Sequence, residues 1–343
     1  MKTILITGAG GYIGSVMVEM LLAKGYNVKG LDRFFFGENL LSKEILNNPR
    51  FQLVKNDIRW VAPDVFKGVD AVIDLAALSN DPSGDFDPKL TQEINNLGRV
   101  RIARLSKESG VARYILASSC SVYGHGLEEV LSEDSPLNPL TEYAKANAAA
   151  EKAVIPLHDH SFSTTALRQA TVYGLSYRMR FDLVVNMMTL HAVQRGKIFI
   201  MGGGKQWRPL VHVRDTANAF ILVMESPKDL VNGQVFNIGS SQQNYQIINL
   251  AHIVKENLPI IVDLEIAPDD QDKRNYQVSF EKIKHILGFK PHYTPDMGVK
   301  EIYNALKTGK TETDEKTVTV KWYKYLFDAD EILRKVKIDG RLF

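Results

Sequence analysis

The amino-acid sequence predicts an α/β protein with a doubly wound parallel sheet and a smaller C-terminal lobe. Two observations support this fold class. In the first half of the chain, short apolar runs alternate with stretches of helical periodicity, which is typical of parallel strands joined by crossover helices. In addition, the first apolar run leads directly into a glycine-rich turn that is followed by a helical segment.

The elements can be assigned in chain order. We predict strands over residues 3–7, 28–32, 51–55, 71–75, 114–118 and 164–168, with a first helix over 15–24 that ends at Gly25. After Gly174 the pattern becomes less regular. There we predict a helix over 183–195, short strands over 198–201, 208–213 and 234–238, and a helix over 215–226. The Lys-rich segment 316–337 is predicted to be helical, with its charges facing solvent.

Composition narrows the class of protein. The chain has 343 residues, 45% hydrophobic and 24% charged, which is enough apolar material for a full core. The net charge is only +2, which does not favour a nucleic-acid-binding protein, and no apolar run reaches the roughly 18 residues that cross a bilayer. Cys120 is the single cysteine, and the eight histidines show no metal-ligand spacing. We expect a cytoplasmic protein that binds no metal, nucleic acid or membrane.

The glycine-rich turn predicts a dinucleotide site. Its sequence, G-A-G-G-Y-I-G, places Gly8, Gly11 and Gly14 where a tight turn, an approaching pyrophosphate and a close helix–strand contact require glycine. The helix N-terminus that follows favours an anion. Asp32 closes the second strand 24 positions after Gly8, near the offset of a carboxylate that binds the adenosine ribose. Asp32 favours NAD over NADP, although the neighbouring Arg33 is able to accept a 2′-phosphate.

Further motifs follow in an order that resembles the extended short-chain dehydrogenase/reductases, specifically the branch of nucleotide-sugar epimerases and dehydratases. These motifs are N-D-I-R at 56–59, D-L-A-A-L at 74–78, S-S-C-S-V-Y-G at 118–124 and a tyrosine that opens a helix at 143. The resemblance extends from residue 2 to at least residue 283. It implies a Rossmann-type fold, NAD as the cofactor, a nucleotide-sugar substrate and a homodimer.

The resemblance also implies an organisation and a set of contacts. Residues 1–174 with about 209–240 would form the NAD-binding domain, and residues 175–208 and 241–343 the substrate-binding lobe and tail. The expected cofactor-binding residues are Gly8, Gly11, Tyr12, Ile13, Gly14, Asp32, Arg33, Asp57, Ile58, Leu75, Ala76, Ala77, Asn95, Tyr143 and Asn147. The expected substrate-binding residues are Ser79, Ser121, Asn186, Arg208 and Arg274.

Tyr143 and Ser119 are the expected catalytic pair. Oxidation of a sugar carbinol requires removal of its hydroxyl proton, and a tyrosinate is able to accept that proton if its pKa, normally about 10, is lowered. A serine hydroxyl helps to position and polarise the reacting oxygen. We assign Tyr143 as the base and Ser119 as the polarising group.

The chain departs from the family signature Tyr-x-x-x-Lys, because Asn147 stands where the lysine is expected. That lysine binds the nicotinamide ribose and lowers the pKa of the tyrosine. Lys145 lies two residues from Tyr143 and is expected to point away from it. Three explanations remain open: another cation substitutes, the positive nicotinamide suffices, or the protein is impaired. The last explanation leads to an alternative function, a non-catalytic sensor of NAD or of a sugar nucleotide.

A second departure concerns the reaction type. The 4,6-dehydratases of the family carry an Asp-Glu pair after the catalytic Ser/Thr, whereas this chain has Cys120 and Ser121. Neither residue is a suitable acid or base for β-elimination near neutral pH, so a dehydratase is disfavoured. We predict NAD-dependent redox chemistry at C4 of the sugar, with an epimerase favoured over a 4-dehydrogenase or ketoreductase.

Overall fold

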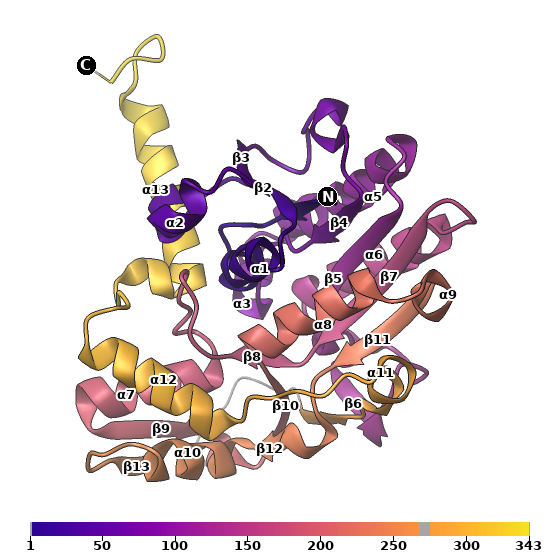
Figure 1. The fold of residues 1–343 in the computed structure, drawn as a ribbon. Helices are drawn as coiled ribbons and strands as arrows, with labels where there is room; N and C mark the ends of the chain where they lie inside the picture. The colour runs from indigo at the N-terminus through magenta and orange to yellow at the C-terminus, as the bar shows by residue number, and fades with distance from the viewer. Residues whose placement is uncertain (1, 268–274, 343) are drawn as a thin grey trace.

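The computed structural model, which describes residues 2–267 and 275–342, contains a seven-stranded parallel sheet (Figure 1). Its strands, in the order β11-β7-β5-β4-β1-β2-β3, are β11 (Gln234–Ile238), β7 (Ser163–Gln169), β5 (Arg113–Ser119), β4 (Ala71–Asp74), β1 (Thr3–Thr7), β2 (Asn27–Asp32) and β3 (Phe51–Lys55). This arrangement confirms the predicted doubly wound α/β fold. The chain reverses its direction of winding between β1 and β4, where such sheets bind their ligands beyond the carboxyl ends of the strands.

Both faces of the sheet are buried, as the apolar strands predict. Ile4 and Ile6 of β1 face one core, whereas Leu5 between them faces the other. Helices α1 (Tyr12–Ala23) and α8 (Val213–Glu225) cover the first face. Helices α5 (Arg99–Glu108) and α6 (Glu142–Val154) cover the second, and α5 follows a π-helical turn over Gln92–Gly98.

A smaller group of elements surrounds a third core (Figure 1). It contains the sheet β12 (Asn244–Gln246), β10 (Trp207–His212) and β8 (Thr171–Tyr173), the pair β9 (Lys197–Met201) and β13 (Asp263–Ala267), and helices α7 (Val184–Arg195), α10 (Ile247–Glu256) and α12 (Pro295–Lys307). Strand β6 (His125–Leu131) pairs with β14 (Asn275–Val278). The short helices are α2 (Lys43–Leu46), α3 (Asp81–Phe86), α4 (Pro88–Thr91), α9 (Lys228–Val231) and α11 (Glu281–Leu287).

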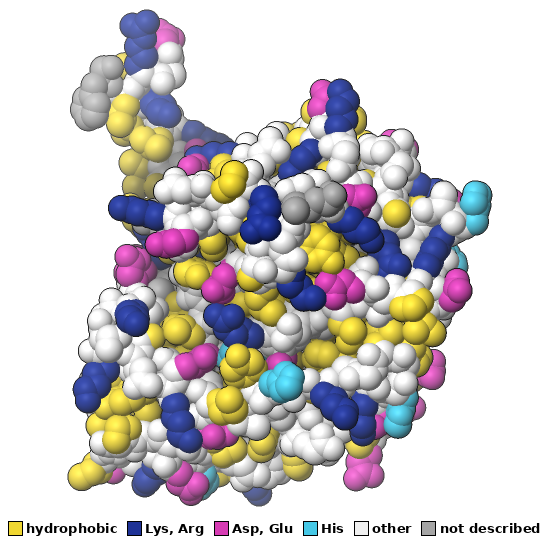
Figure 2. Space-filling view, in the orientation of Figure 1, with side chains coloured by type: hydrophobic (Ala, Val, Ile, Leu, Met, Phe, Trp, Pro, Cys, Tyr) yellow, Lys and Arg dark blue, Asp and Glu magenta, His cyan; other side chains and the backbone are white. Residues whose placement is uncertain are grey.

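The C-terminal helix α13 (Thr319–Val336) returns to the loop that follows β2. Its lysines Lys321 and Lys324 are exposed, as predicted. The sequence did not predict that its first turns pack on the sheet domain: Trp322 donates its indole N–H to the carbonyl of Phe35 at 2.7 Å. Figure 2 shows the outer part of α13 projecting from the body of the protein. Within the described ranges, every helix is too short or too polar to span a bilayer.

Candidate active site

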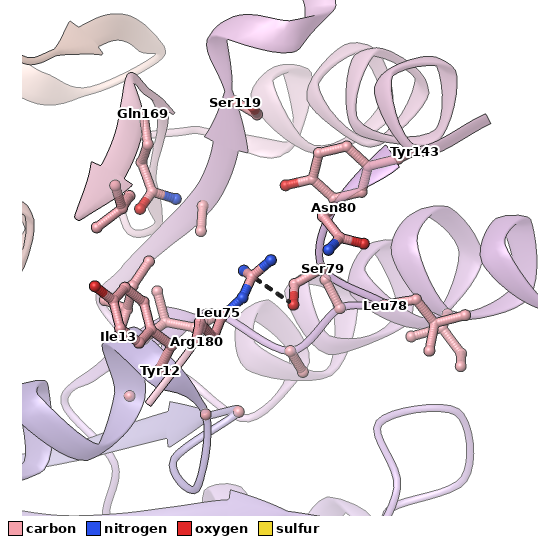
Figure 3. Close-up of a pocket in the computed structure, with 18 of the residues that line it drawn as sticks. Tyr12, Ile13, Leu75, Leu78, Ser79, Asn80, Ser119, Tyr143, Gln169 and Arg180 are labelled. Carbon is pink, nitrogen blue, oxygen red and sulfur yellow. Dashed lines mark hydrogen bonds between the residues drawn. The ribbon is translucent and has the colours of Figure 1, made fainter. Parts of the chain in front are cut away.

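A long pocket lies at the carboxyl ends of β1, β4 and β5 and extends toward the smaller lobe (Figure 3). It is lined by every predicted cofactor residue except Asn95 and Asn147. Ser119, Ser79 and Ser121 line it as well. The structure therefore places most of the residues singled out in the sequence around one cavity.

The glycine turn forms one end of the pocket, and its backbone geometry requires glycine at two positions. Gly8 has a φ of +71°, and a Cβ atom on it would lie 2.9 Å from the backbone nitrogen of Ala76. A Cβ atom on Gly14 would lie 2.0 Å from the carbonyl oxygen of Gly8. The N-terminus of α1 is thus held against the end of β1, where it faces the pocket.

Asp32 and Arg33 are already engaged in ways that favour NAD. The Asp32 carboxylate accepts the backbone N–H of Gly10 at 2.9 Å, and burial raises the pKa of this carboxyl. Arg33 forms an ion pair with Asp57 at 3.0 Å, and its guanidinium lies 4.8 Å from the ring centre of Phe35. A carboxylate at the ribose position disfavours the 2′-phosphate of NADP. Arg33 would otherwise be able to bind that phosphate, but it is paired with Asp57.

The pocket wall contains buried polar atoms that have no hydrogen-bond partner among the described residues. These are Nε of Arg99, Oγ of Ser118, Oγ of Ser121, Oε1 of Gln169 and Nε of Arg178. An unpaired buried polar atom costs about 1–3 kcal/mol. Unpaired polar atoms around one pocket fit a ligand that is itself rich in donors and acceptors, as a dinucleotide and a sugar are.

Tyr143 lies in the first turn of α6 and points its hydroxyl into the pocket (Figure 3). Thr141 caps the helix by accepting the N–H of Ala144 at 3.2 Å, and its own hydroxyl donates to Asp81. Gly84 of α3 packs so closely that a Cβ atom on it would lie 2.7 Å from Cβ of Tyr143. These contacts fix the position of the tyrosine before any ligand binds.

The surroundings of Tyr143 act on its pKa in opposite directions. Burial, the largest effect, and the Asp81 carboxylate raise the pKa of Tyr143 above its ordinary value, whereas the charges of Arg99 and Arg180 oppose that rise. The hydroxyl oxygen of Ser119 accepts the N–H of Ser121 at 3.1 Å. Because that contact uses an oxygen lone pair, the hydroxyl hydrogen of Ser119 is left to donate to a sugar oxygen.

Asn147 and Asn95 lie one layer behind the pocket wall. Asn147 is 1% exposed and accepts a hydrogen bond from Nη1 of Arg99 at 2.8 Å. Asn95 is fully buried and bonds both the N–H and the carbonyl of Leu78, at 2.8 and 3.0 Å. Asn95 thus holds the loop after β4, which itself lines the pocket.

Two of the predicted substrate residues also stand behind the wall. Asn186 is fully buried and donates to the hydroxyl of Tyr12 at 3.1 Å. Arg208 is 5% exposed, with its guanidinium 5.9 Å from the ring centre of Tyr276, which lines the pocket. Arg274 lies outside the described residues.

Sequence reasoning missed two buried arginines between β8 and α7. Arg180 lies at the centre of the pocket, where it pairs with Asp182 through two contacts of 3.0 Å and reaches the hydroxyl of Ser79 at 3.4 Å (Figure 3). Arg178 stacks over the ring of Phe36 at 3.7 Å, and burial lowers its pKa to about 10. The available signal was an R-M-R-F-D run between a predicted strand and a predicted helix.

Helix α13 supplies the other unexpected part of the pocket. Tyr323 lines it and packs on Phe35 and Phe36, with ring centres 6.1 and 5.5 Å away. We predict that Tyr323→Ala weakens NAD binding about 5- to 10-fold, because removing a buried aromatic contact of this kind costs about 1 kcal/mol or more. Titration calorimetry with NAD measures the effect. Ile332→Ala on the same helix is the control, because this side chain is 60% exposed, and an equal loss there would refute a local role for Tyr323.

Comparison with known proteins shows which family model and which relatives the chain matches. The model described as the NAD dependent epimerase/dehydratase family matches residues 4–239. UDP-glucose 4-epimerase of Mycolicibacterium smegmatis is 30% identical over 314 residues, which cover 86% of this chain and 95% of that protein. UDP-glucuronic acid decarboxylase 1 of Arabidopsis thaliana is 28% identical over 91% of this chain and 71% of that protein. The solved structure of MoeE5 with UDP-glucuronic acid and NAD has a TM-score of 0.79 at 26% identity, covering 90% of this chain and 99% of that one.

Proposed function

The chain belongs to the NAD-dependent epimerase/dehydratase family and is an enzyme of the extended short-chain dehydrogenase/reductase class, and we propose that it is a UDP-sugar 4-epimerase. The observation that supports this most is the placement of Tyr143 and Ser119 in the same pocket as the glycine turn. The UDP-glucose 4-epimerase of Mycolicibacterium smegmatis aligns with this chain over 95% of its own length, and this similarity supports UDP as the nucleotide.

The proposed chemistry divides between cofactor and protein. Bound NAD would supply the hydride acceptor for C4 of the sugar and, once reduced, the hydride donor. Tyr143 takes the proton of the C4 hydroxyl and gives it back, and Ser119 donates a hydrogen bond to the C4 oxygen. Ser79, Ser121 and Gln169 offer donors and acceptors to the remaining sugar oxygens, and the wall around them excludes water during the keto stage. The configuration at C4 is inverted if the keto-sugar rotates in the pocket, so that the hydride returns to its opposite face.

The side chains near Tyr143 favour an epimerase over a dehydratase. The thiol of Cys120 is buried against the carbonyl of Arg168 at 3.3 Å, and burial raises its pKa, so it is a poor acid or base at neutral pH. Ser121 has only a hydroxyl to offer. A decarboxylase remains the second candidate, because UDP-glucuronic acid decarboxylases are prominent among the relatives and also fit a redox step at C4.

A panel of nucleotide sugars tests the proposal. Each is incubated with the protein and a small amount of NAD, and the sugar signals are followed by proton NMR. We expect a new C4 epimer of a UDP-sugar at constant NAD. Formation of a pentose from UDP-glucuronate would replace the proposal by a decarboxylase, and NADH formed in proportion to sugar would replace it by a dehydrogenase.

We also propose that the enzyme is a homodimer formed through α5 and α6. The groove between these helices is lined by the apolar side chains of Leu97, Val100, Leu105, Ala149 and Ala153, with Asn96, Arg101, Arg104 and Glu108 beside them, and Leu97 is 61% exposed. We predict that Leu97→Glu converts a dimer to a monomer, which light scattering detects, while Leu230→Glu, also exposed but on α9, leaves the mass unchanged. A monomeric mass for the unmodified protein would contradict this proposal.

A further inference from the structure

Arg99 occupies the place beside Asn147 where the sequence lacks a lysine. Its side chain is 1% exposed and lines the pocket. Nη1 donates to the Oδ1 atom of Asn147 at 2.8 Å. Asn147 in turn donates from Nδ2 to the carbonyl of Tyr143, one helical turn earlier, at 2.9 Å. The asparagine therefore connects the guanidinium to the turn that holds the tyrosine.

The guanidinium is fixed by the ends of two strands. Nη2 donates to the carbonyl of Asp74, which closes β4, at 3.3 Å and to the carbonyl of Ala117 in β5. Nε has no hydrogen-bond partner among the described residues and lies 3.9 Å from the Asp74 carboxylate. Arg99 is thus held rigidly at the pocket wall, and its Nε donor is still unused.

We propose that Arg99 supplies to Tyr143 the positive charge that the lysine of a Tyr-x-x-x-Lys motif provides, and that Asn147 is the positioning residue that holds this guanidinium. The inference rests on the proposed function, in which Tyr143 is the base. It also explains why position 147 carries a neutral amide: a lysine there would set a second buried cation against Arg99 and remove the acceptor of its hydrogen bond.

Other charged groups also face Tyr143 or Arg99. Asp81 of α3 lies on the pocket side and opposes the effect of Arg99 on the tyrosine. Arg180 acts in the same direction as Arg99 but is paired closely with Asp182, at 3.0 Å. At the exposed start of α6, Asp85 accepts the N–H of Glu142 at 2.9 Å, and Glu142 pairs with Lys145 at 2.7 Å.

The Asp74 carboxylate faces Arg99 from β4. It accepts hydrogen bonds from the hydroxyls of Thr7 and Tyr114, and burial raises its pKa. These hydroxyls satisfy its two oxygens, so the 3.9 Å contact with Arg99 is a loose pair.

Titration of Tyr143 itself tests the inference. Tyrosinate absorbance is measured against pH, with and without NAD, and the same titration of Tyr143→Phe is subtracted to isolate this one side chain. We expect Arg99→Met to raise the pKa of Tyr143 by about 1 or more, as loss of a neighbouring cation does. Arg99→Met with Asn147→Lys should return the pKa most of the way, because it moves the cation to the motif position.

Arg101→Met is the matched control, since this arginine of the same helix donates to the carbonyl of Val61 at 2.9 Å and should leave Tyr143 unchanged. If Arg99→Met does not fold, Arg99→Met with Asp74→Asn removes both members of the buried pair and takes its place. An unchanged pKa of Tyr143 in a folded Arg99 variant, or a shift that Asn147→Lys does not reverse, would overturn the inference. The titration needs no substrate, so its outcome is independent of which sugar the enzyme converts.

Discussion

Tyr143→Phe should lower kcat about 10²- to 10⁴-fold, because it removes the group that exchanges a proton with the sugar hydroxyl. The ring stays, so the packing of Gly84 against the first turn of α6 is retained. NAD should still bind, because the substitution keeps the ring of Tyr143 and leaves the glycine turn and Asp32 of the same pocket unchanged. Steady-state rates with the sugar identified by NMR, together with calorimetric NAD affinity, measure both quantities.

Tyr325→Phe provides the control for loss of a phenolic hydroxyl, because this side chain is 52% exposed on α13. The rate of the unmodified enzyme should rise with pH as Tyr143 ionises, since only the ionised form accepts the proton. This rise of the rate with pH should be absent from the residual activity of Tyr143→Phe. A variant that keeps more than about a tenth of the original rate would be inconsistent with a general base at this position.

Gly14→Ala should weaken NAD binding by about 5- to 150-fold, the equivalent of the 1–3 kcal/mol that overpacking typically costs. The added Cβ atom would lie 2.0 Å from the carbonyl oxygen of Gly8. Neither atom belongs to a flexible side chain, so α1 must move away from the end of β1. That movement displaces the helix N-terminus from the site where we place the pyrophosphate.

Gly126→Ala is the matched control, because its Cβ atom would first meet a side-chain end, Cδ1 of Leu131, at 3.2 Å. Calorimetry with NAD gives the affinities, and circular dichroism checks that each variant is folded. Equal NAD affinity in Gly14→Ala and the unmodified protein would show that the cofactor does not depend on this close approach of helix and strand.

The strands of the parallel sheet were the most predictable part of the fold. Residues 3–7, 51–55 and 234–238 are strands with the predicted bounds, and the strands predicted over 28–32, 71–75, 114–118 and 164–168 end within one residue of the observed ones. The first helix begins at Tyr12 rather than at residue 15, since the last glycine of the turn lies within the helix. Strand β6 was not predicted, because H-G-L-E-E-V-L shows no alternation of apolar and polar residues.

The pocket was predictable where the residues of one motif adjoin one strand end, as in the glycine turn and the segment after β4. It was not predictable where distant segments meet. Arg99 and Asn147 are 48 positions apart, and Trp322 and Phe35 are 287 apart. No local pattern encodes such contacts, so the cation that faces Tyr143 and the helix that covers Phe35 emerged only from the fold.

The most direct test of the proposed reaction uses the converted UDP-sugar labelled with deuterium at C4. The enzyme is supplied with the labelled sugar and a small amount of NAD, and the product is analysed by proton NMR and mass spectrometry. The proposal predicts a product with inverted configuration at C4 that still carries the deuterium there. Loss of the label to solvent, or a product that keeps its C4 configuration, would contradict it.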